Sequence, residues 1–393
     1  MSMKRSLDVI RRTPIFRTAI ATLCLTTLFA CSTQEEKEQG PAPLPEFKAE
    51  RDFDKLWSHG IGNGQGDLYN RLTPAVRGSK IIAAAANGDV EAYDRVTGRS
   101  LWDADIDRAI SGGVGIGCGL AFVASEDGGV WALSEETGKT QWHIQLNAQV
   151  LAPPVCDNDV VAVLTFSGDL FGLNAANGEK KWSYTGTAPV LSLRASAAPL
   201  LHNGAVIAGL GTGKVIALEL ESGTQLWEAR VGVSQGSSEI ERQIDVGGDM
   251  LIDDDTLYVA SFQGRLAAID LRSGRRTWDV AASSYVGLSE GYGNVYVAGA
   301  AGSVTAFSKN NQGVRWEQTA LARRQLSGSA VLDNYVVVGD IEGYLHLLSQ
   351  IDGHFAARMR VDSDGIRVAP IVVDDVMYVY GNSGTLAAYQ LEK

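Results

Sequence analysis

The sequence is short of basic residues. Lys and Arg number 34 against 46 Asp and Glu, so the 393-residue chain has a formal net charge of −12 at pH 7. A nucleic-acid-binding protein needs a clustered basic excess to neutralise phosphates, and the body of the chain has no such cluster. We therefore expect no nucleic-acid partner.

Motifs for catalysis, metals and cofactors are also missing. The five His stand at spacings that no metal site uses, and the patterns HExxH, CxxC, GxSxG and the P-loop do not occur. The Gly-rich stretch 112–119 fits GxGxxG in no register. We interpret Asp253 to Asp255 as a solvated hairpin turn, with a calcium loop as the alternative. The sequence thus predicts no catalytic residue, no metal site and no cofactor.

No apolar run reaches the roughly 20 residues that a transmembrane helix needs. The run at residues 19–30 is short and follows five basic residues and a single acid, Asp8, which is typical of a signal peptide at residues 1–30. The segment from Leu28 to Cys31 resembles the bacterial lipobox. We therefore expect Cys31 to be acylated and to become the N-terminus, the alternative being an ordinary secretory signal with a chance cysteine.

Residues 31–50 are charged and Pro-rich with little to bury, and they are predicted to form a flexible, lipidated tether. Loss of residues 1–30 takes the formal net charge from −12 to −16. Anionic headgroups would repel such a chain. Attachment to a membrane must therefore come from the acyl chains.

One pattern recurs eight times along the rest of the chain. In each copy a Gly opens an alternating strand, and in seven copies a small residue follows four positions later; Leu347 is the exception. A Trp stands fourteen positions after the Gly in six copies, whereas the seventh copy has Ala357 there. The copies begin at Gly88, Gly128, Gly168, Gly213, Gly264, Gly302, Gly343 and Gly384. Their spacing is the length of one four-stranded propeller blade.

The six equivalent Trp are interpreted as structural contacts between blades rather than as an aromatic cage for a ligand. They are Trp102, Trp142, Trp182, Trp227, Trp278 and Trp316. The eighth copy ends at Lys393 before it can form its Trp strand, while Trp57 has no copy of its own. We expect the segment Phe53 to Trp57 to supply the outer strand of the last blade. The prediction is an all-β, eight-bladed propeller of four-stranded antiparallel blades over residues 51–393, closed by its N-terminal strand.

Two connections between copies are longer than the others, the one after Trp182 and the one after Trp227. Because they belong to adjacent blades and follow the same strand, we expect them to lie side by side on one rim. Leu191, Leu193 and Arg194 in the first connection, with Asp245 in the second, form a candidate protein-binding site. In the alternative interpretation the Leu side chains begin the next blade and Arg194 pairs locally with Asp245.

Two cysteines remain once Cys24 is removed with the signal peptide and Cys31 is acylated. Cys118 and Cys156 stand at unequal positions in adjacent copies. An oxidising compartment permits a disulfide between them, and the sequence leaves open whether it forms.

The copies that read Ala-x-Asp-x-x-[Thr/Ser]-Gly-x-x-x-Trp resemble the propeller repeat of quinoprotein dehydrogenases. Beyond the repeat, more specific segments lie at residues 191–194, 239–245, 271–274 and 338–346. With these segments, residues 31–393 resemble the BamB family, the lipoproteins of the β-barrel assembly machinery.

This resemblance implies a non-enzymatic scaffold on the inner leaflet of the outer membrane, facing the periplasm, since Ser32 rather than Asp follows Cys31. It implies binding to the periplasmic domains of the barrel-forming partner BamA through Leu191, Leu193, Arg194 and Asp245, and assistance to nascent outer-membrane proteins. The family's second aspartate is replaced here by Gly247. The alternative function is that of a quinone-cofactor dehydrogenase, against which stands the lack of a paired-cysteine disc and of a calcium ligand set.

Overall fold

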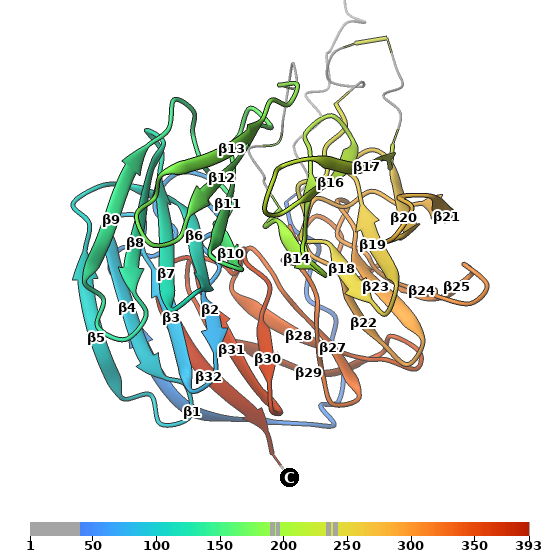
Figure 1. Cartoon of the computed structure of the whole chain (residues 1–393). Coiled ribbons are helices and arrows are strands. Elements are labelled where there is room, and N and C mark those ends of the chain that lie inside the picture. Colours follow the sequence, from blue (N-terminus) through green and yellow to red (C-terminus); the bar gives the residue numbers. More distant parts are fainter. Residues whose placement is uncertain (1–39, 189–192, 194–196, 233–236, 239–242, 393) are drawn as a thin grey trace, which may run out of the picture. The chain divides into compact units, whose positions relative to one another are not determined.

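The computed structural model describes residues 40–188, 193, 197–232, 237–238 and 243–392. Its compact unit spans Pro41–Lys393 and contains eight separate four-stranded antiparallel sheets. The sheets follow one another around a central axis in chain order (Figure 1). The prediction of an all-β, eight-bladed propeller is confirmed.

Each blade is one sheet whose strands run from the axis outward. Blades 1 to 4 comprise β2 (Ala75–Arg77), β3 (Lys80–Ala84), β4 (Asp89–Asp94) and β5 (Ser100–Asp105); β6 (Ile110–Gly117), β7 (Leu120–Ser125), β8 (Gly129–Ser134) and β9 (Thr140–Gln145); β10 (Val155–Asp157), β11 (Val160–Leu164), β12 (Leu170–Asn174) and β13 (Lys180–Tyr184); β14 (Leu200–His202), β15 (Ala205–Gly209), β16 (Lys214–Glu219) and β17 (Gln225–Arg230). Blades 5 to 8 comprise β18 (Leu251–Asp253), β19 (Thr256–Ala260), β20 (Arg265–Asp270) and β21 (Arg276–Ala281); β22 (Ser289–Gly291), β23 (Asn294–Ala298), β24 (Val304–Ser308) and β25 (Val314–Gln318); β26 (Ala330–Leu332), β27 (Tyr335–Gly339), β28 (Tyr344–Ser349) and β29 (Phe355–Arg360); β30 (Ile371–Val373), β31 (Val376–Tyr380) and β32 (Thr385–Leu391), with β1 (Phe53–Gly60) outermost.

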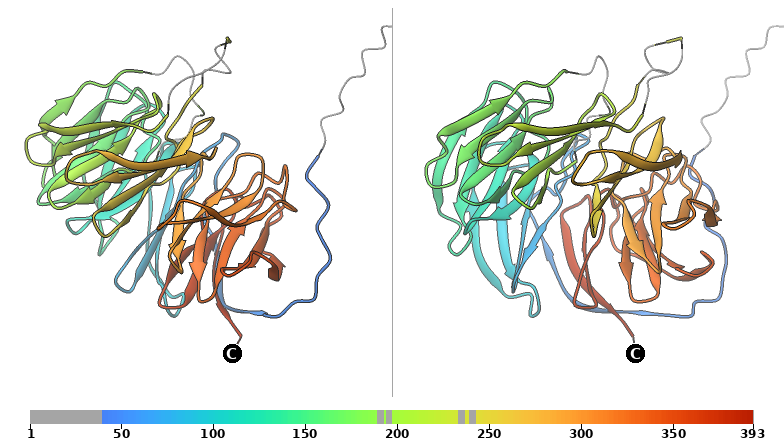
Figure 2. Two further views of the ribbon diagram at one scale, coloured as in Figure 1. Left: turned by 90° about the vertical axis from the view of Figure 1, so that its right-hand side faces the viewer. Right: turned by 45° about the vertical axis from the view of Figure 1, so that its right-hand side comes forward.

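The last blade closes as expected. β1 pairs antiparallel with β32, which places Trp57 opposite Ala388. The N-terminal segment leading to β1 lies along blade 7 (Figure 2): Ala42 donates its N–H to Ala322 O at 3.0 Å, and Glu50 donates to Ala356 O at 2.8 Å. Residues at both ends of the unit therefore complete the ring together.

The small residue of each repeat lies directly opposite the Trp of the same blade. Ala92 pairs with Trp102 and Gly172 with Trp182, and a Cβ placed on Gly172 would lie 2.1 Å from the indole of Trp182. The small side chain thus leaves room for the indole that lies over it. In blade 7 both positions change together, because Leu347 lies opposite Ala357. The two exceptions to the repeat compensate each other in size.

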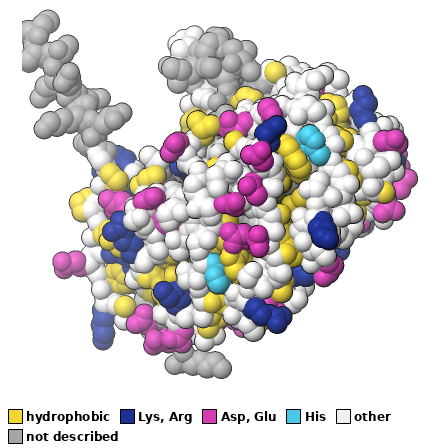
Figure 3. All heavy atoms as spheres, turned by 90° about the vertical axis from the view of Figure 1, so that its left-hand side faces the viewer, with side chains coloured by type: hydrophobic (Ala, Val, Ile, Leu, Met, Phe, Trp, Pro, Cys, Tyr) yellow, Lys and Arg dark blue, Asp and Glu magenta, His cyan; other side chains and the backbone are white. Residues whose placement is uncertain are grey.

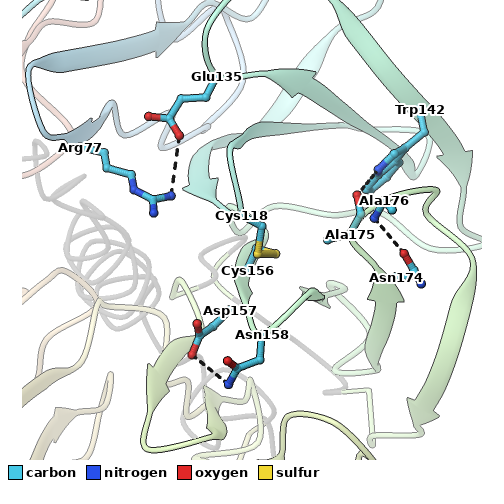
Figure 4. Close-up of a disulfide and its surroundings, with 10 residues drawn as sticks. All are labelled: Arg77, Cys118, Glu135, Trp142, Cys156, Asp157, Asn158, Asn174, Ala175 and Ala176. Carbon is cyan, nitrogen blue, oxygen red and sulfur yellow. Dashed lines mark hydrogen bonds and ion pairs between the residues drawn. A yellow bond between two sulfur atoms is a disulfide. The ribbon is translucent and has the colours of Figure 1, made fainter.

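The Trp side chains hold neighbouring blades together. Trp142 donates its indole N–H to Ala175 O of the next blade at 2.7 Å (Figure 4) and stacks on the hairpin Gly178, whose added Cβ would lie 2.8 Å from the ring. The same arrangement, in which a Trp binds the carbonyl three residues before a hairpin Gly, occurs at six junctions. The Trp–Gly pairs are Trp57–Gly98, Trp102–Gly138, Trp142–Gly178, Trp182–Gly223, Trp227–Gly274 and Trp316–Gly353.

We call this arrangement of a Trp indole and a hairpin Gly the Trp–Gly clasp. Two junctions lack the clasp, each for a structural reason. The hairpin of blade 6 has Gln312 at the left-handed position, with φ of 61°, where the other hairpins have Gly. Its Cβ takes the place where an indole stacks elsewhere, and Trp278 stays partly buried with no carbonyl partner among the described residues. Blade 8 has no hairpin to stack on because its outer strand comes from the N-terminus, which explains Ala357 in blade 7. Trp278 still packs against the hydrophobic cluster that blades 5 and 6 share, as expected of a contact between blades, but it does so without the clasp.

Replacing Gln312 with Gly is expected to raise the free energy of unfolding by about 1 kcal/mol, because it removes the strain of a side chain in the left-handed region and frees the stacking position for Trp278. Urea unfolding measures the gain, and a blue shift of Trp fluorescence reports burial of the indole. The matched control is Gln312→Ala, which keeps the Cβ. A gain as large in this control would contradict the clasp model.

Cys118 and Cys156 form a disulfide between blades 2 and 3 (Figure 4), which settles the pairing that the sequence left open. Cys118 follows β6 and Cys156 lies in β10. The Gly-rich stretch before Cys118 has a structural role: a Cβ on Gly115 would lie 1.8 Å from Pro154 O, and one on Gly117 would lie 2.4 Å from Cys156 O. These glycines let β6 pack directly against the backbone of β10.

Candidate partner-binding site

The two long connections meet, as the repeat analysis predicts. The backbone N–H of Leu193 donates to Asp245 Oδ2 at 3.2 Å, and that of Ala198 donates to Asp249 Oδ1 at 3.2 Å. Two carboxylates from the connection before blade 5 thus hold the backbone of the connection before blade 4. Leu191 and Arg194 lie outside the described residues, as does Cys31.

Asp245 is held inside this site rather than on its surface. Its side chain belongs to a residue only 1% exposed, and its backbone bridges to Phe262, whose N–H donates to Asp245 O at 2.8 Å. The next residue, Val246, packs in the hydrophobic core shared by blades 4 and 5. Asp245 is therefore placed to hold the backbone of Leu193, whose side chain is partly buried.

Gly247 has a partner of its own in the structure. Its carbonyl accepts a hydrogen bond from Arg71 Nη2, while Arg71 Nη1 donates to Tyr285 O at 2.8 Å. Arg71 precedes blade 1, so its guanidinium reaches across to the segments before blades 5 and 6. The repeat gives no sign of this contact, because Arg71 lies outside the repeated pattern.

Blade 7 contains a buried ionic network that was not predicted from the sequence. Arg324 Nε lies 2.7 Å from Asp340 Oδ2, and His346 Nε2 lies 2.8 Å from the same oxygen; the three side chains are 2%, 0% and 0% exposed. The segment 338–346 could have indicated this network, since an Asp and a His stand there among apolar strand residues.

His346 is neutral in this network. Burial holds its pKa below the ordinary value, and its Nδ1 accepts a hydrogen bond from Arg358 Nε at 3.3 Å while Nε2–H donates to Asp340. The pKa of Asp340 is lowered despite burial, because His346, Arg324 and backbone N–H groups bind its carboxylate. Both ring nitrogens are thus hydrogen-bonded and shielded from solvent, so neither is accessible to a substrate.

The same network anchors the N-terminal segment. Arg324 Nη1 donates to Ala42 O at 2.7 Å, and Arg358 Nη2 donates to Pro45 O at 3.0 Å. Phe47 stacks on Phe355 with ring centroids 5.4 Å apart. The described part of the expected tether is therefore bound to blade 7 from residue 42 onward.

The described part of the chain contains neither a cluster of metal-ligating side chains nor a candidate membrane-spanning helix. Nowhere in the described ranges do three His, Cys, Asp or Glu side chains come together as a metal site requires. None of the described residues forms a helix of the length and apolar character that crossing a bilayer demands. Figure 3 shows Asp and Glu side chains gathered in the middle of the face formed by the left-hand blades of Figure 1, in keeping with the acidic composition.

Comparison with known proteins identifies the family. A family model described as "Outer membrane protein assembly factor BamB" matches residues 86–318 and 300–393. The assembly factor BamB of Pseudomonas aeruginosa is 58% identical over 373 residues, which is 95% of this chain and 98% of that protein. BamB of Xanthomonas campestris pv. campestris is 39% identical over 397 residues, covering 95% and 97%.

Solved structures agree with this family assignment. The crystal structure of BamB from Moraxella catarrhalis superposes with a TM-score of 0.79 at 29% identity, covering 86% of this chain and all of that one. The quinohemoprotein alcohol dehydrogenase of Comamonas testosteroni gives a TM-score of 0.70 at 15% identity over 86% of this chain and 76% of that one, which shows a shared fold alone. The chain belongs to the family of the outer membrane protein assembly factor BamB.

Proposed function

We propose that this outer-membrane protein assembly factor is a lipoprotein facing the periplasm that works as a scaffold and not as an enzyme. In this proposal residues 1–30 are a signal peptide, Cys31 carries the acyl chains, and the segment up to the anchor at Ala42 is the free tether. Its partners belong to the β-barrel assembly complex. The dehydrogenase alternative is not supported, because the shared fold with a quinohemoprotein enzyme carries no activity with it.

The finer proposal is that the chain binds the periplasmic domains of BamA through Leu191, Leu193 and Arg194. The observation that supports it most is the bond from the backbone of Leu193 to buried Asp245, because it holds the Leu193 backbone in place without using an exposed side chain. A backbone position that is held in advance loses less conformational entropy on binding. Asp245 then acts as a positioning residue, and Leu191, Leu193 and Arg194 make the contact.

Replacing Arg194 with Glu is expected to abolish capture of BamA, since reversal of a charge at a docking loop removes attraction and adds repulsion. The measurement is an affinity pull-down of BamA from detergent-solubilised outer membranes, with Leu193→Ala as a second variant. The matched control is Arg230→Glu, because Arg230 is an exposed arginine on the outer strand β17. Loss of capture in this control, or full capture by Arg194→Glu, would contradict the assigned site.

Nascent outer-membrane proteins are a second proposed partner. The outermost strand of each blade has one edge with no neighbour in its own sheet, as in β5, β9 and β13. An extended client segment can add to such an edge through backbone hydrogen bonds. Photocrosslinkable peptides from barrel strands should therefore label residues of the outer strands, and labelling nowhere on the propeller would rule this partner out.

A further inference from the structure

A cavity of about 260 Å³ lies on the propeller axis, where the segments leading into the innermost strands converge. Seven of the eight blades line it with the residue two positions before the innermost strand, and five of these seven residues are Gly, Ala or Pro. Small side chains leave the axis open at this level. Asp249 is the one acidic side chain among the residues that line the cavity.

Two arginines from neighbouring blades also line the cavity. Arg71 and Arg367 each stand four residues before the innermost strand of their blade, β2 and β30. The guanidinium of Arg367 lies 4.6 Å from the ring centroid of Tyr69, and its Nη1 donates to Leu68 O at 3.0 Å and to Asn70 O at 3.2 Å. The guanidinium of Arg71 is held by the carbonyls of Tyr285 and Gly247. Backbone carbonyls thus fix both groups in place.

Neither arginine has an ionic partner in the described part of the chain. Among the described residues neither guanidinium forms an ion pair with a carboxylate, and Arg367 Nε is buried without an acceptor. Burial lowers the pKa of Arg367, as expected of a guanidinium partly removed from water. Asp249 carries one negative charge, but its Oδ1 already accepts the N–H of Ala198. Two positive charges and one negative leave the cavity with an excess of one positive charge.

A partly buried charge without a counter-ion is costly, and a buried guanidinium N–H without an acceptor adds to that cost. Water can hydrate these groups but cannot neutralise them. A carboxylate can do both, because its two oxygens match the paired N–H donors of a guanidinium. The cavity volume admits a carboxylate with a short attached group.

We propose that the axial cavity is a binding site for one carboxylate group, held by the guanidinium groups of Arg367 and Arg71 that line it. The group belongs either to a small free carboxylate or to an acidic side chain or C-terminus of a bound protein. The proposal does not depend on the BamA contact assigned above. It concerns the axis, whereas that contact concerns the loop with Leu193.

The first experiment uses ¹³C-labelled acetate and the purified mature chain. Saturable line broadening of the acetate signal is expected with wild type at constant ionic strength in chloride. Binding should weaken at least tenfold in Arg367→Gln and in Arg71→Gln, and Arg367→Lys, which keeps the charge but loses the paired donors, should fall between. The matched control is Arg275→Gln on the exposed hairpin of blade 5. Thermal unfolding shows that each variant is folded; if Arg71→Gln does not fold, Arg367→Gln carries the test alone.

The second experiment separates the two sources of the carboxylate. Soluble periplasmic domains of BamA are titrated against wild type, Arg367→Gln and Arg194→Glu. If acetate binds as described, the site takes free carboxylates. The other outcome is that acetate does not bind, but Arg367→Gln weakens the protein complex at least tenfold, as Arg194→Glu also does. In that case the carboxylate comes from the partner. Equal acetate binding by all variants, or no effect of Arg367→Gln in either experiment, overturns the proposal.

Discussion

Replacing Asp340 with Ala is expected to lower the free energy of unfolding by about 3–5 kcal/mol, the cost of leaving buried charge without its partner. Arg324 and His346 both bind Asp340 Oδ2, and the N–H groups of Glu342 and Tyr344 bind Oδ1 at 2.9 and 3.0 Å. The variant leaves all four donors without this acceptor inside blade 7. Urea unfolding measures the loss as a shift of the midpoint.

The control for this experiment lies in the same network. Glu342 also binds Arg324, but its side chain is 48% exposed, so Glu342→Gln should cost less than about 1 kcal/mol. Limited proteolysis adds a second measurement. Because Arg324 anchors Ala42, loss of Asp340 should expose the segment before β1 to cleavage, whereas loss of Glu342 should not. Equal losses in the two variants would show that burial does not decide the strength of this network.

The sequence predicts the parts of this molecule that repeat. Eight equivalent copies fix the number of blades, and the missing strand after Gly384 together with the unmatched Trp57 fixes how the ring closes. Both predictions follow from counting, because every blade must bury the same kind of face against its neighbour. The adjacency of the two long connections follows from the same argument, since equivalent loops of adjacent blades share a rim.

Other features could not be predicted because they depend on contacts between residues far apart in the sequence. Arg324 meets Ala42 and Arg71 meets Gly247 across many repeats, and nothing in the spacing of the copies marks these pairs. The burial of Asp245 likewise depends on the neighbouring connection and on Phe262. Gln312 is a different case. The residue at the hairpin position of blade 6 is visible in the sequence, and comparison with the six hairpin glycines would have predicted that Trp278 cannot stack.

Replacing Trp182 with Ala is expected to cost about 3–5 kcal/mol, because the indole is 8% exposed, bonds to Leu220 O at 2.8 Å and stacks on Gly223. Trp278→Ala is the matched comparison at an equivalent position of another blade. It should cost no more than about 2 kcal/mol, since this indole is partly buried and makes no bond to the next blade. Urea unfolding of both variants, followed by circular dichroism, measures the difference.

The comparison tests whether the Trp–Gly clasp or simple burial of an aromatic ring joins the blades. In a repeat fold each blade is stabilised mainly through its two neighbours, so an absent clasp weakens one junction rather than the whole ring. A cavity of about 360 Å³ lies between the end of β21 and blade 6, and Ala282, Val297 and Phe307 are among the residues that line it. If Trp182→Ala and Trp278→Ala cost the same, the clasp adds nothing beyond burial. If the two losses of stability differ as expected, the junction after β21 is weaker than the clasped junctions. The backbone amides of β21 and β24 should then exchange with solvent faster than those of β17 and β20.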